Sequence, residues 1–180
     1  KLFDWLSGPN SIVQSKFNAV DAAYQGLQQA TARISEAPGV ICNAPYKSTW
    51  YVPSGDSYMS TLLQDAQADY LWSDTQGTGG IPLDFEAVFA KGHAAPFWIN
   101  PGYAESKKDL SGKDARLKEF TAYAMGNIYN NTKRVSASGG NDYWESGIVN
   151  PHLILADLIR IFHPQTLPDH ELYYYQRLTE

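Results

Sequence analysis

The tripeptide Gly55-Asp56-Ser57 has the residue types of a catalytic serine motif found in hydrolases. Serine catalysis needs a histidine within hydrogen-bonding distance of the hydroxyl and a third group that orients this histidine. A hydrolase family with this motif carries Asp-x-x-His near the end of its chain, whereas Asp169 and His170 are adjacent here. We therefore predict no catalytic residue and expect Ser57 to begin a helix. A hydrolase that uses Ser57 remains an alternative.

Metal-binding residue types are present but are not grouped. The four histidines are scattered, and no His-Glu-x-x-His or Cys-x-x-Cys spacing occurs. We therefore predict no resident metal ion or cofactor, and local structural roles for His163 and His170. A chelatase-like metal enzyme that uses these two histidines is a further alternative. The single cysteine, Cys42, lies in an apolar run and is expected to be buried.

Aromatic residues are more informative, because several lie in segments expected to be loops. The chain has 12 Tyr, 7 Phe and 5 Trp. Aromatic side chains are costly to expose, so aromatic loops that gather at one edge favour a binding surface over simple packing. Such a surface suits a large, flat or partly apolar ligand, oriented by Asn100, Asn141 and Asp142. The candidate ligand-binding residues are Trp50, Tyr51, Asn100, Tyr103, Asn141, Asp142, Tyr143 and Trp144.

The elements that position these loops follow from hydrophobic periodicity. Apolar residues at steps of three and four predict a long helix that starts at Asn10 or Ser11 and ends near Ile34. Further helices are expected at 57–66, at 84–89 with Asp84 as cap, and at 113–124, 151–162 and 169–178. Short apolar runs predict strands at 40–42, 70–72, 96–100 and 128–129. This alternation favours an α/β sandwich with a mostly parallel sheet, in which ligands bind outside the carboxyl ends of the strands.

The composition limits the size and the partners of the chain. A length of 180 residues suits one well-packed domain. The formal net charge of −5 and the lack of any basic run disfavour nucleic acid as a partner. No apolar stretch approaches the ~20 residues of a membrane span. The first residues show no signal peptide and look like the interior of a larger protein.

A set of ordered motifs resembles the second half of periplasmic binding proteins of the iron-siderophore and cobalamin class. The resemblance covers the entire chain but only the back half of such proteins. The motifs that carry it are Trp50–Met59, Phe85–Val88, Phe97–Asn100, Asn141–Gly147, the segment from Pro151 to His163-Pro164, Pro168–Leu172 and Tyr173-Tyr174.

The resemblance implies a three-layer α/β lobe of the chelatase-like, or class III, type. Residues 1–36 are then the lead-in and the long helix that joins two lobes. Residues 37–180 are then the C-terminal ligand-binding lobe, without its N-terminal counterpart. The ligand is expected between the lobes, against the aromatic loops. At the position where some relatives have a ligand-contacting arginine, this chain has Ser146.

The same resemblance implies a function without catalysis. It predicts the solute-binding component of an ABC importer, which captures a metal chelate (ferric siderophore, cobalamin or haem) and delivers it to the permease. Such a protein is periplasmic or an extracytoplasmic lipoprotein, held at the membrane by the permease or a lipid anchor. Asp56 matches the carboxylate that docks on permease arginines, although cobalamin-type proteins tend to have glutamate there, and helix capping is the alternative role. A protein-interaction domain that uses the aromatic loops remains the rival function.

Overall fold

The central element of the fold is a five-stranded sheet with the order β4-β1-β6-β7-β8. The computed structural model describes residues 11–102 and 104–180. The first four strands of this order are parallel and β8 is antiparallel to β7, which confirms the predicted mostly parallel sheet. The strands are β1 (Gly39–Cys42), β4 (Asp69–Tyr70), β6 (Phe97–Ile99), β7 (Ile128–Asn130) and β8 (Gln176–Arg177).

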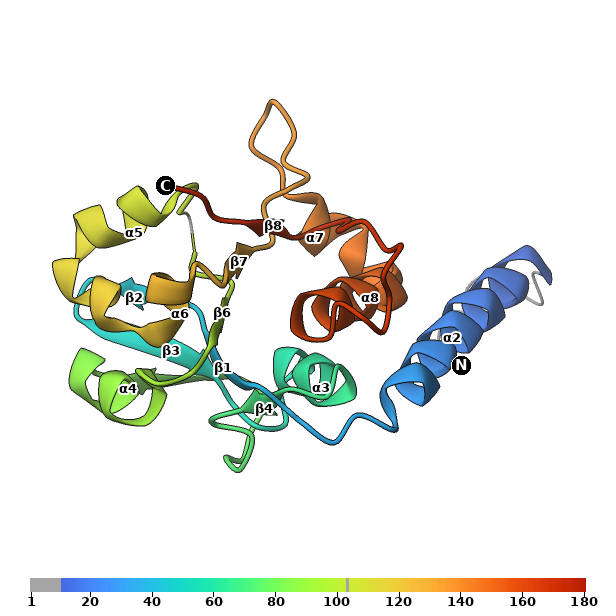
Figure 1. The fold of residues 1–180 in the computed structure, drawn as a ribbon. Helices are drawn as coiled ribbons and strands as arrows, with labels where there is room; N and C mark the ends of the chain where they lie inside the picture. The colour runs from blue at the N-terminus through green and yellow to red at the C-terminus, as the bar shows by residue number, and fades with distance from the viewer. Residues whose placement is uncertain (1–10, 103) are drawn as a thin grey trace.

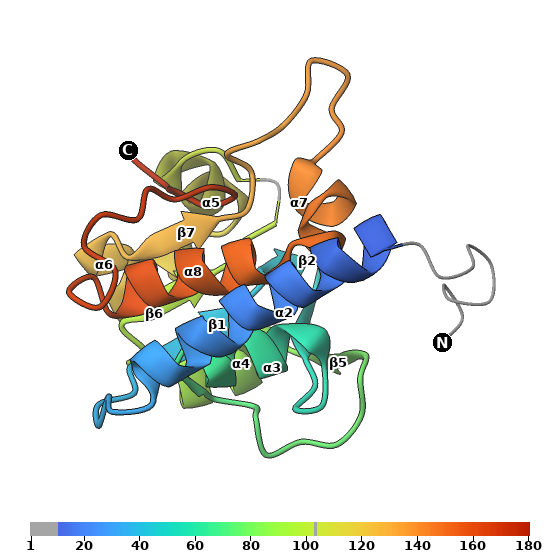
Figure 2. The ribbon, with the colours of Figure 1, turned by 90° about the vertical axis from the view of Figure 1, so that its right-hand side faces the viewer.

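Helices cover both faces of this sheet, so the domain has three layers (Figure 1). On one face lie α3 (Tyr58–Asp65) and α8 (Pro151–Phe162). On the other lie α4 (Phe85–Gly92), α5 (Lys107–Lys113) and α6 (Thr121–Met125), with the 3-10 helix η1 (Ala115–Glu119) between the last two. The long helix α2 (Ser11–Thr31) packs on α8 from outside (Figure 2). The three-layer α/β expectation is therefore confirmed.

A small antiparallel sheet lies where the sequence analysis expected a loop. It has the order β2-β3-β5, formed by β2 (Pro45–Tyr46), β3 (Thr49–Pro53) and β5 (Gly80–Leu83). Its register pairs Trp50 with Leu83 and Tyr51 with Pro82. Because successive side chains of a strand point to opposite faces, Trp50 and Tyr51 are separated by this sheet.

Trp50 belongs to the hydrophobic core. Its ring stacks on Trp98 at a centroid distance of 5.5 Å, and its Nε1 donates to the carbonyl of Cys42 at 2.9 Å. Both tryptophans have an exposed fraction of 0%. Phe120 packs against both rings, at 5.7 Å from Trp50 and 5.3 Å from Trp98. Cys42 is buried as expected.

Two predicted helices are wrong. The segment 113–124 is interrupted at Asp114 and Phe120, because the Asp114 carboxylate accepts from the amide of Arg116 and the Phe120 ring turns into the core. The segment 169–178 contains β8 instead of a helix. The amides of Tyr173, Tyr174 and Tyr175 donate to a buried carboxylate of α8 and therefore cannot form helical hydrogen bonds.

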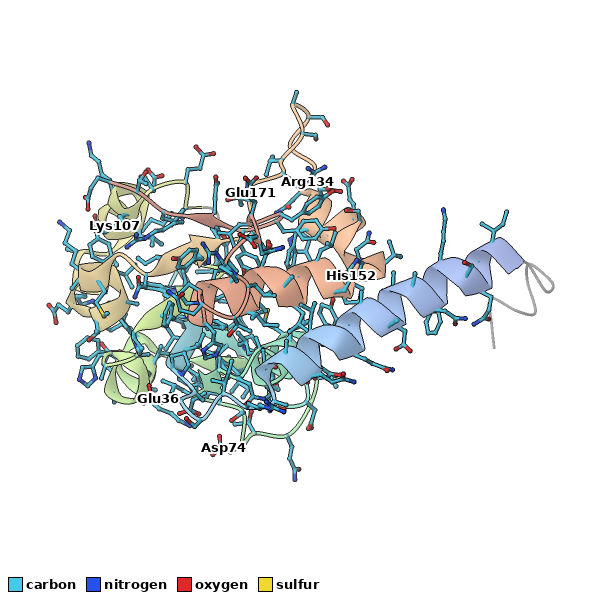
Figure 3. The ribbon with its side chains drawn as sticks, turned by 45° about the vertical axis from the view of Figure 1, so that its right-hand side comes forward. Glu36, Asp74, Lys107, Arg134, His152 and Glu171 are labelled. Carbon is cyan, nitrogen blue, oxygen red and sulfur yellow. The ribbon has the colours of Figure 1, made fainter. Side chains whose placement is uncertain are left out.

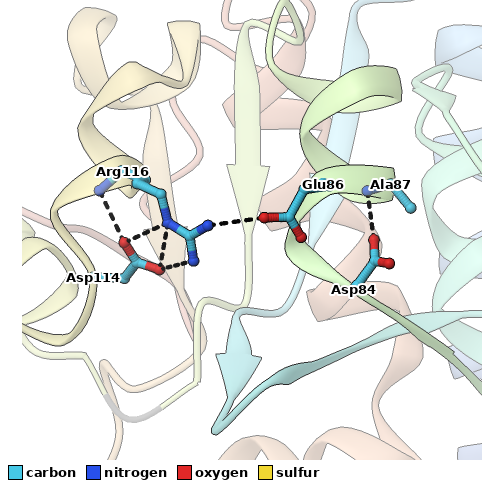
Figure 4. Close-up of polar contacts among 5 residues, drawn as sticks. All are labelled: Asp84, Glu86, Ala87, Asp114 and Arg116. Carbon is cyan, nitrogen blue, oxygen red and sulfur yellow. Dashed lines mark hydrogen bonds and ion pairs between the residues drawn. The ribbon is translucent and has the colours of Figure 1, made fainter.

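A surface network ties α4 to η1 (Figure 4). The guanidinium of Arg116 pairs with Asp114 at 2.7 Å and with Glu86 at 3.0 Å, and it lies 3.8 Å above the centroid of the Phe85 ring. The predicted cap of α4 is confirmed, since the Asp84 carboxylate accepts from the amide of Ala87 at 2.7 Å.

Helix α2 contacts the rest of the chain mainly through its second half. The Tyr24 hydroxyl donates to the Asp65 carboxylate at 2.5 Å, and the Thr31 hydroxyl donates to the Asp65 carbonyl at 3.2 Å. In the first half, Phe17 of the predicted apolar face is 65% exposed. The predicted helix start at Asn10 and the rest of the lead-in lie outside the described residues. Within residues 11–102 and 104–180, no helix is both long and apolar enough to cross a bilayer.

Candidate ligand-binding site

The candidate site begins at the carboxyl ends of β1 and β6, where two asparagines turn the chain. Asn43 and Asn100 follow these strands directly and have left-handed φ values of 63° and 57°. Asparagine adopts this conformation more readily than most residues. The Asn43 amide donates to the Tyr51 carbonyl at 2.6 Å, so it fixes β3 beside the edge of the main sheet. The backbone amide of Asn100 donates to the Tyr129 carbonyl at 2.9 Å.

Helix α7 (Asp142–Glu145) supplies the aromatic corner of the site. Asn141 caps it, because its side-chain oxygen accepts from the amide of Tyr143 at 3.0 Å. Tyr143 is 2% exposed and Trp144 is 60% exposed, with ring centroids 4.7 Å apart in an edge-to-face contact. The buried tyrosine therefore supports the exposed tryptophan, whose ring is available to a ligand.

Behind this corner lies a group of buried tyrosines that the sequence analysis missed. The rings of Tyr174 and Tyr175 meet Tyr143 edge-to-face at 5.9 and 5.8 Å, and both are 0% exposed. Burial raises the pKa of all three hydroxyl groups. The Tyr173-Tyr174-Tyr175 run was a visible signal, but its partners are 28 or more positions away and spacing alone did not reveal them.

Met59 joins α3 to this group. Its sulfur accepts from the side-chain amide of Asn100 at 3.5 Å and from the hydroxyl of Tyr143 at 3.8 Å. The other polar atom of Asn100, Oδ1, is buried and has no hydrogen-bond partner among the described residues. Asn100 and Tyr143, which the sequence placed in separate loops, are thus brought together around one methionine.

An ion pair lies at the start of α7, beside the aromatic corner. Nε of Arg134 lies 2.7 Å from Oδ2 of Asp142. The hydrogen bond from Arg134 is the main cause of the lowered pKa of Asp142. Arg134 stands at the base of the projecting hairpin between β7 and α7 (Figure 3), and its guanidinium lies 4.4 Å above the centroid of the Tyr173 ring.

A buried carboxylate of α8 fixes the tyrosine group. Asp157 is 0% exposed and accepts hydrogen bonds from the amides of Tyr173, Tyr174 and Tyr175 at 2.8, 2.7 and 3.0 Å. The Asp157 carboxylate also contacts Nε2 of His170 at 2.7 Å. These contacts give His170 the local structural role that was predicted for it.

Of the predicted ligand-binding residues, one is wrong and one lies outside the described residues. Trp50 is wrong, because burial in the core leaves no face of its ring open to a ligand. Tyr103 lies outside the described residues. Tyr51 is half exposed on β3, whereas Asn141, Asp142 and Trp144 share the start of α7. Met59, Arg134, Tyr174 and Tyr175 are additions from the structure.

The alternative catalytic residues have structural roles. The Ser57 hydroxyl caps α3 by accepting from the amide of Ser60 at 3.2 Å, as the sequence analysis expected. Nε2 of His163 contacts the carbonyl of Gln67 at 3.0 Å. Across the described residues, no group of three or more histidine, cysteine or acidic side chains could hold a metal ion.

Asp56 lies at an exposed turn before α3. Its carboxylate accepts from the amide of Gly77 at 2.8 Å, and its own amide donates to the Gly77 carbonyl at 3.1 Å. Asp56 thus links two loops, and Ser57 caps the helix in its place. Its docking role on a permease stays a prediction.

Comparison with solved structures defines the class of fold. FepB from Veillonella parvula, a TroA-like periplasmic binding protein, superposes with a TM-score of 0.63 and 14% identity over 91% of this chain and 55% of its own. IsdE of S. aureus, solved in complex with haem, gives a TM-score of 0.64 and 12% identity over 90% of this chain and 61% of its own. The chain therefore has the fold of a lobe of the TroA-like, class III periplasmic binding proteins. It spans little more than half the length of these two proteins.

Sequence comparison adds one curated relative. The chain is 22% identical over 146 residues to an uncharacterized lipoprotein of Methanocaldococcus jannaschii, an alignment that covers 79% of this chain and 33% of the lipoprotein. No protein-family model matches the chain. An ABC transporter substrate-binding protein from Listeria monocytogenes has the same fold, with a TM-score of 0.61 and 13% identity over 84% of this chain and 57% of its own.

Proposed function

We propose that this chain is the C-terminal ligand-binding lobe of a solute-binding protein, which delivers a metal chelate to an ABC importer. One observation carries the proposal: the exposed Trp144 is supported by buried Tyr143, whose hydroxyl shares the sulfur of Met59 with Asn100 at the carboxyl end of β6. An exposed tryptophan on a rigid support is typical of a binding surface. The fold likeness adds support, since two of the similar structures are solute-binding proteins of ABC transporters.

In this proposal the ligand lies between this lobe and a second lobe. Helix α2, with 21 residues and a length of about 30 Å, is the connection between the two. Because one continuous helix resists bending, closure on the ligand is modest, and release follows docking on the permease through Asp56. The protein then acts outside the cytoplasmic membrane, in agreement with the lipoprotein relative and the periplasmic neighbours.

Ferric siderophores, cobalamin and haem are the proposed cargo. The solved structures include one in complex with haem and one with bound Ni(II), so proteins of this fold bind metal species of different shapes. The aromatic corner suits the flat or partly apolar surface that such chelates present.

Calorimetric titration of the full-length protein with cobalamin, haem and a panel of ferric siderophores tests the proposal. Calorimetry is preferable to fluorescence because the key residue is itself a tryptophan. We expect saturable binding of one chelate, weakened at least about tenfold (about 1.4 kcal/mol) by Trp144→Ala and largely restored by Trp144→Phe. Met125→Ala is the matched control, since Met125 is also a large exposed apolar side chain, 54% exposed on α6.

Failure to bind any of these ligands would rule out the metal-chelate function. The rival function, a protein-interaction domain, is favoured by Ile148 and Val149, which follow α7 and are each 67% exposed. If the chain is a protein-interaction domain, a substitution of Ile148 would weaken its complex with the partner protein, and titration with chelates would give no binding heat.

A further inference from the structure

A guanidinium group lies beside the aromatic corner, although Arg134 is not among the ligand-binding residues predicted from the sequence. Arg134 lies at the base of the projecting hairpin (Figure 3). The bridge between Val135 and Asn141 pairs the two ends of this hairpin, so Arg134 lies beside the start of α7. The Asp142 amide donates to the Arg134 carbonyl at 3.0 Å, and the side chains form the 2.7 Å ion pair. Asp142 and Trp144 share one helix of four residues. The positive charge of Arg134 therefore belongs to the same corner as the exposed indole.

The guanidinium of Arg134 is held in place by two contacts, but its two Nη groups are not used in them. The Tyr173 ring holds its plane from below at 4.4 Å, and Nε is engaged by Asp142. Neither Nη atom donates to any of the described residues, and the side chain is 45% exposed. The two Nη groups form a planar fork that matches a carboxylate or another oxyanion in a bidentate contact.

We propose that Arg134 recognises an anionic group of the ligand, so that the cargo is an anionic chelate rather than a neutral corrinoid. This inference rests on the proposed function and narrows its ligand class. Closure over a neutral ligand would cover the free donors of Arg134 without a partner, which is costly. An anionic ligand supplies oxygen atoms to these donors, while Nε keeps its contact with Asp142.

The chain offers a closely matched control for this arginine. Arg116 pairs with Asp114 at 2.7 Å (Figure 4), as Arg134 pairs with Asp142. Its guanidinium also lies over an aromatic ring, that of Phe85, at 3.8 Å from the ring centroid. It lies in the α4–η1 layer instead of the aromatic corner. If substitution of either arginine weakened ligand binding, the cause would be the loss of net positive charge or of stability. If only substitution of Arg134 weakened binding, the cause would be loss of a direct contact with the ligand.

The test compares ligands that differ mainly in charge. Haemin and its dimethyl ester form one pair, since esterification removes both carboxylates. An anionic ferric tris-catecholate and a neutral ferric trihydroxamate form the second pair, and cyanocobalamin is the neutral corrinoid. Dissociation constants are measured on the full-length wild-type protein, Arg134→Gln, Arg134→Lys and Arg116→Gln, with the melting temperature of each variant as the check on folding.

We expect the wild type to prefer the anionic member of a pair. Arg134→Gln should weaken anionic binding about tenfold or more and leave neutral ligands unchanged, with Arg134→Lys intermediate and Arg116→Gln without effect. Asp142→Asn should strengthen anionic binding, because asparagine still accepts from Nε but no longer repels the ligand. Equal losses for both ligand classes, or preference for the neutral members, would overturn the inference while the chelate-carrier function stands. If no chelate bound at all, both the proposed chelate-carrier function and the role of Arg134 would be ruled out.

Discussion

Neighbouring aromatic residues differ sharply in exposure at two places in the chain. Trp50 is fully buried and Tyr51 is 50% exposed, and in the second pair Tyr143 is 2% and Trp144 is 60% exposed. The first division follows from the alternation of a strand, and the second from the two faces of a short helix. One member of each pair therefore anchors the surface on which the other is presented.

This division predicts opposite effects for two tryptophan substitutions. Trp50→Ala should lower the free energy of unfolding by about 3–5 kcal/mol, because it leaves a cavity between Trp98 and Phe120. Trp144→Ala should change it by less than about 1 kcal/mol while it weakens ligand binding. Urea denaturation followed by far-ultraviolet circular dichroism measures both. Similar losses for the two variants would contradict the assignment of Trp144 to the surface.

A second residue-scale prediction concerns Asp157. Asp157→Ala removes the acceptor of three backbone amides and should lower the free energy of unfolding by at least about 3 kcal/mol. Hydrogen exchange should accelerate first at residues 173–175, which the carboxylate holds. The control is Asp109→Ala, which removes an exposed carboxylate from the capping box of α5. Unchanged exchange at 173–175 would show that β8 alone fixes this segment.

The sequence was enough to select candidate binding side chains, but it did not predict their burial or their hydrogen-bond partners. Asn100, Tyr143 and Trp144 stand out because polar and aromatic residues cluster after predicted strands. The burial of Trp50 depends on the pairing of β3 with β5, about 30 residues later, which local periodicity does not encode. Asp157 reads as an ordinary helix position, and only the fold reveals the amides that it accepts.

Among the elements, helices with a continuous apolar face were predicted best. Helix α8 matches its predicted range, and α3 and α4 lie within a few residues of theirs. The strands β2, β3 and β5 were missed because they are short, and because they are stabilised by pairing with one another and by burial of Trp50 against distant residues. The wrong helix at 169–178 follows from local propensity, which tertiary hydrogen bonds to Asp157 override.

The cap of α3 gives a prediction that separates the carrier from a hydrolase. Ser57→Ala should lower the free energy of unfolding by about 1 kcal/mol, because the amide of Ser60 loses its acceptor. Chelate affinity should be unchanged, since the hydroxyl points into the first turn of α3. Thermal denaturation and titration of the same sample measure both effects. An esterase activity abolished by Ser57→Ala would instead support the hydrolase alternative.

For the whole molecule, the fold and the exposed surface support the same interpretation. The chain covers 55% and 61% of the two solved proteins described above, and its aromatic corner is open. The first half of α2 extends beyond the body of the domain (Figure 1), and Phe17 in this half is also exposed. In the proposed function, a second lobe would cover these surfaces and would remove their apolar side chains from water.

Because the core contains several buried tyrosines, unfolding at alkaline pH tests the packing of the whole core. Burial raises the pKa of Tyr70, Tyr143 and Tyr175 well above the ordinary tyrosine value of 10.0. Below that value both the folded and the unfolded chain hold these protons, so stability is unaffected. Above it the unfolded chain ionises while the folded chain does not, and stability falls as the pH rises. We therefore expect cooperative alkaline unfolding above pH 10.

Tyrosinate absorbance and circular dichroism, followed together during an alkaline titration, measure this transition. A late step in tyrosinate absorbance should coincide with the loss of circular dichroism, because the buried hydroxyls ionise only when the core opens. Tyr143→Phe should reduce the amplitude of that step, because it removes one of the buried hydroxyl groups. If all tyrosines ionised while the circular dichroism stayed native, the hydroxyls of Tyr143 and Tyr175 would have to be reached by water. The tyrosine group would then line an open cavity instead of supporting Trp144 as a rigid floor.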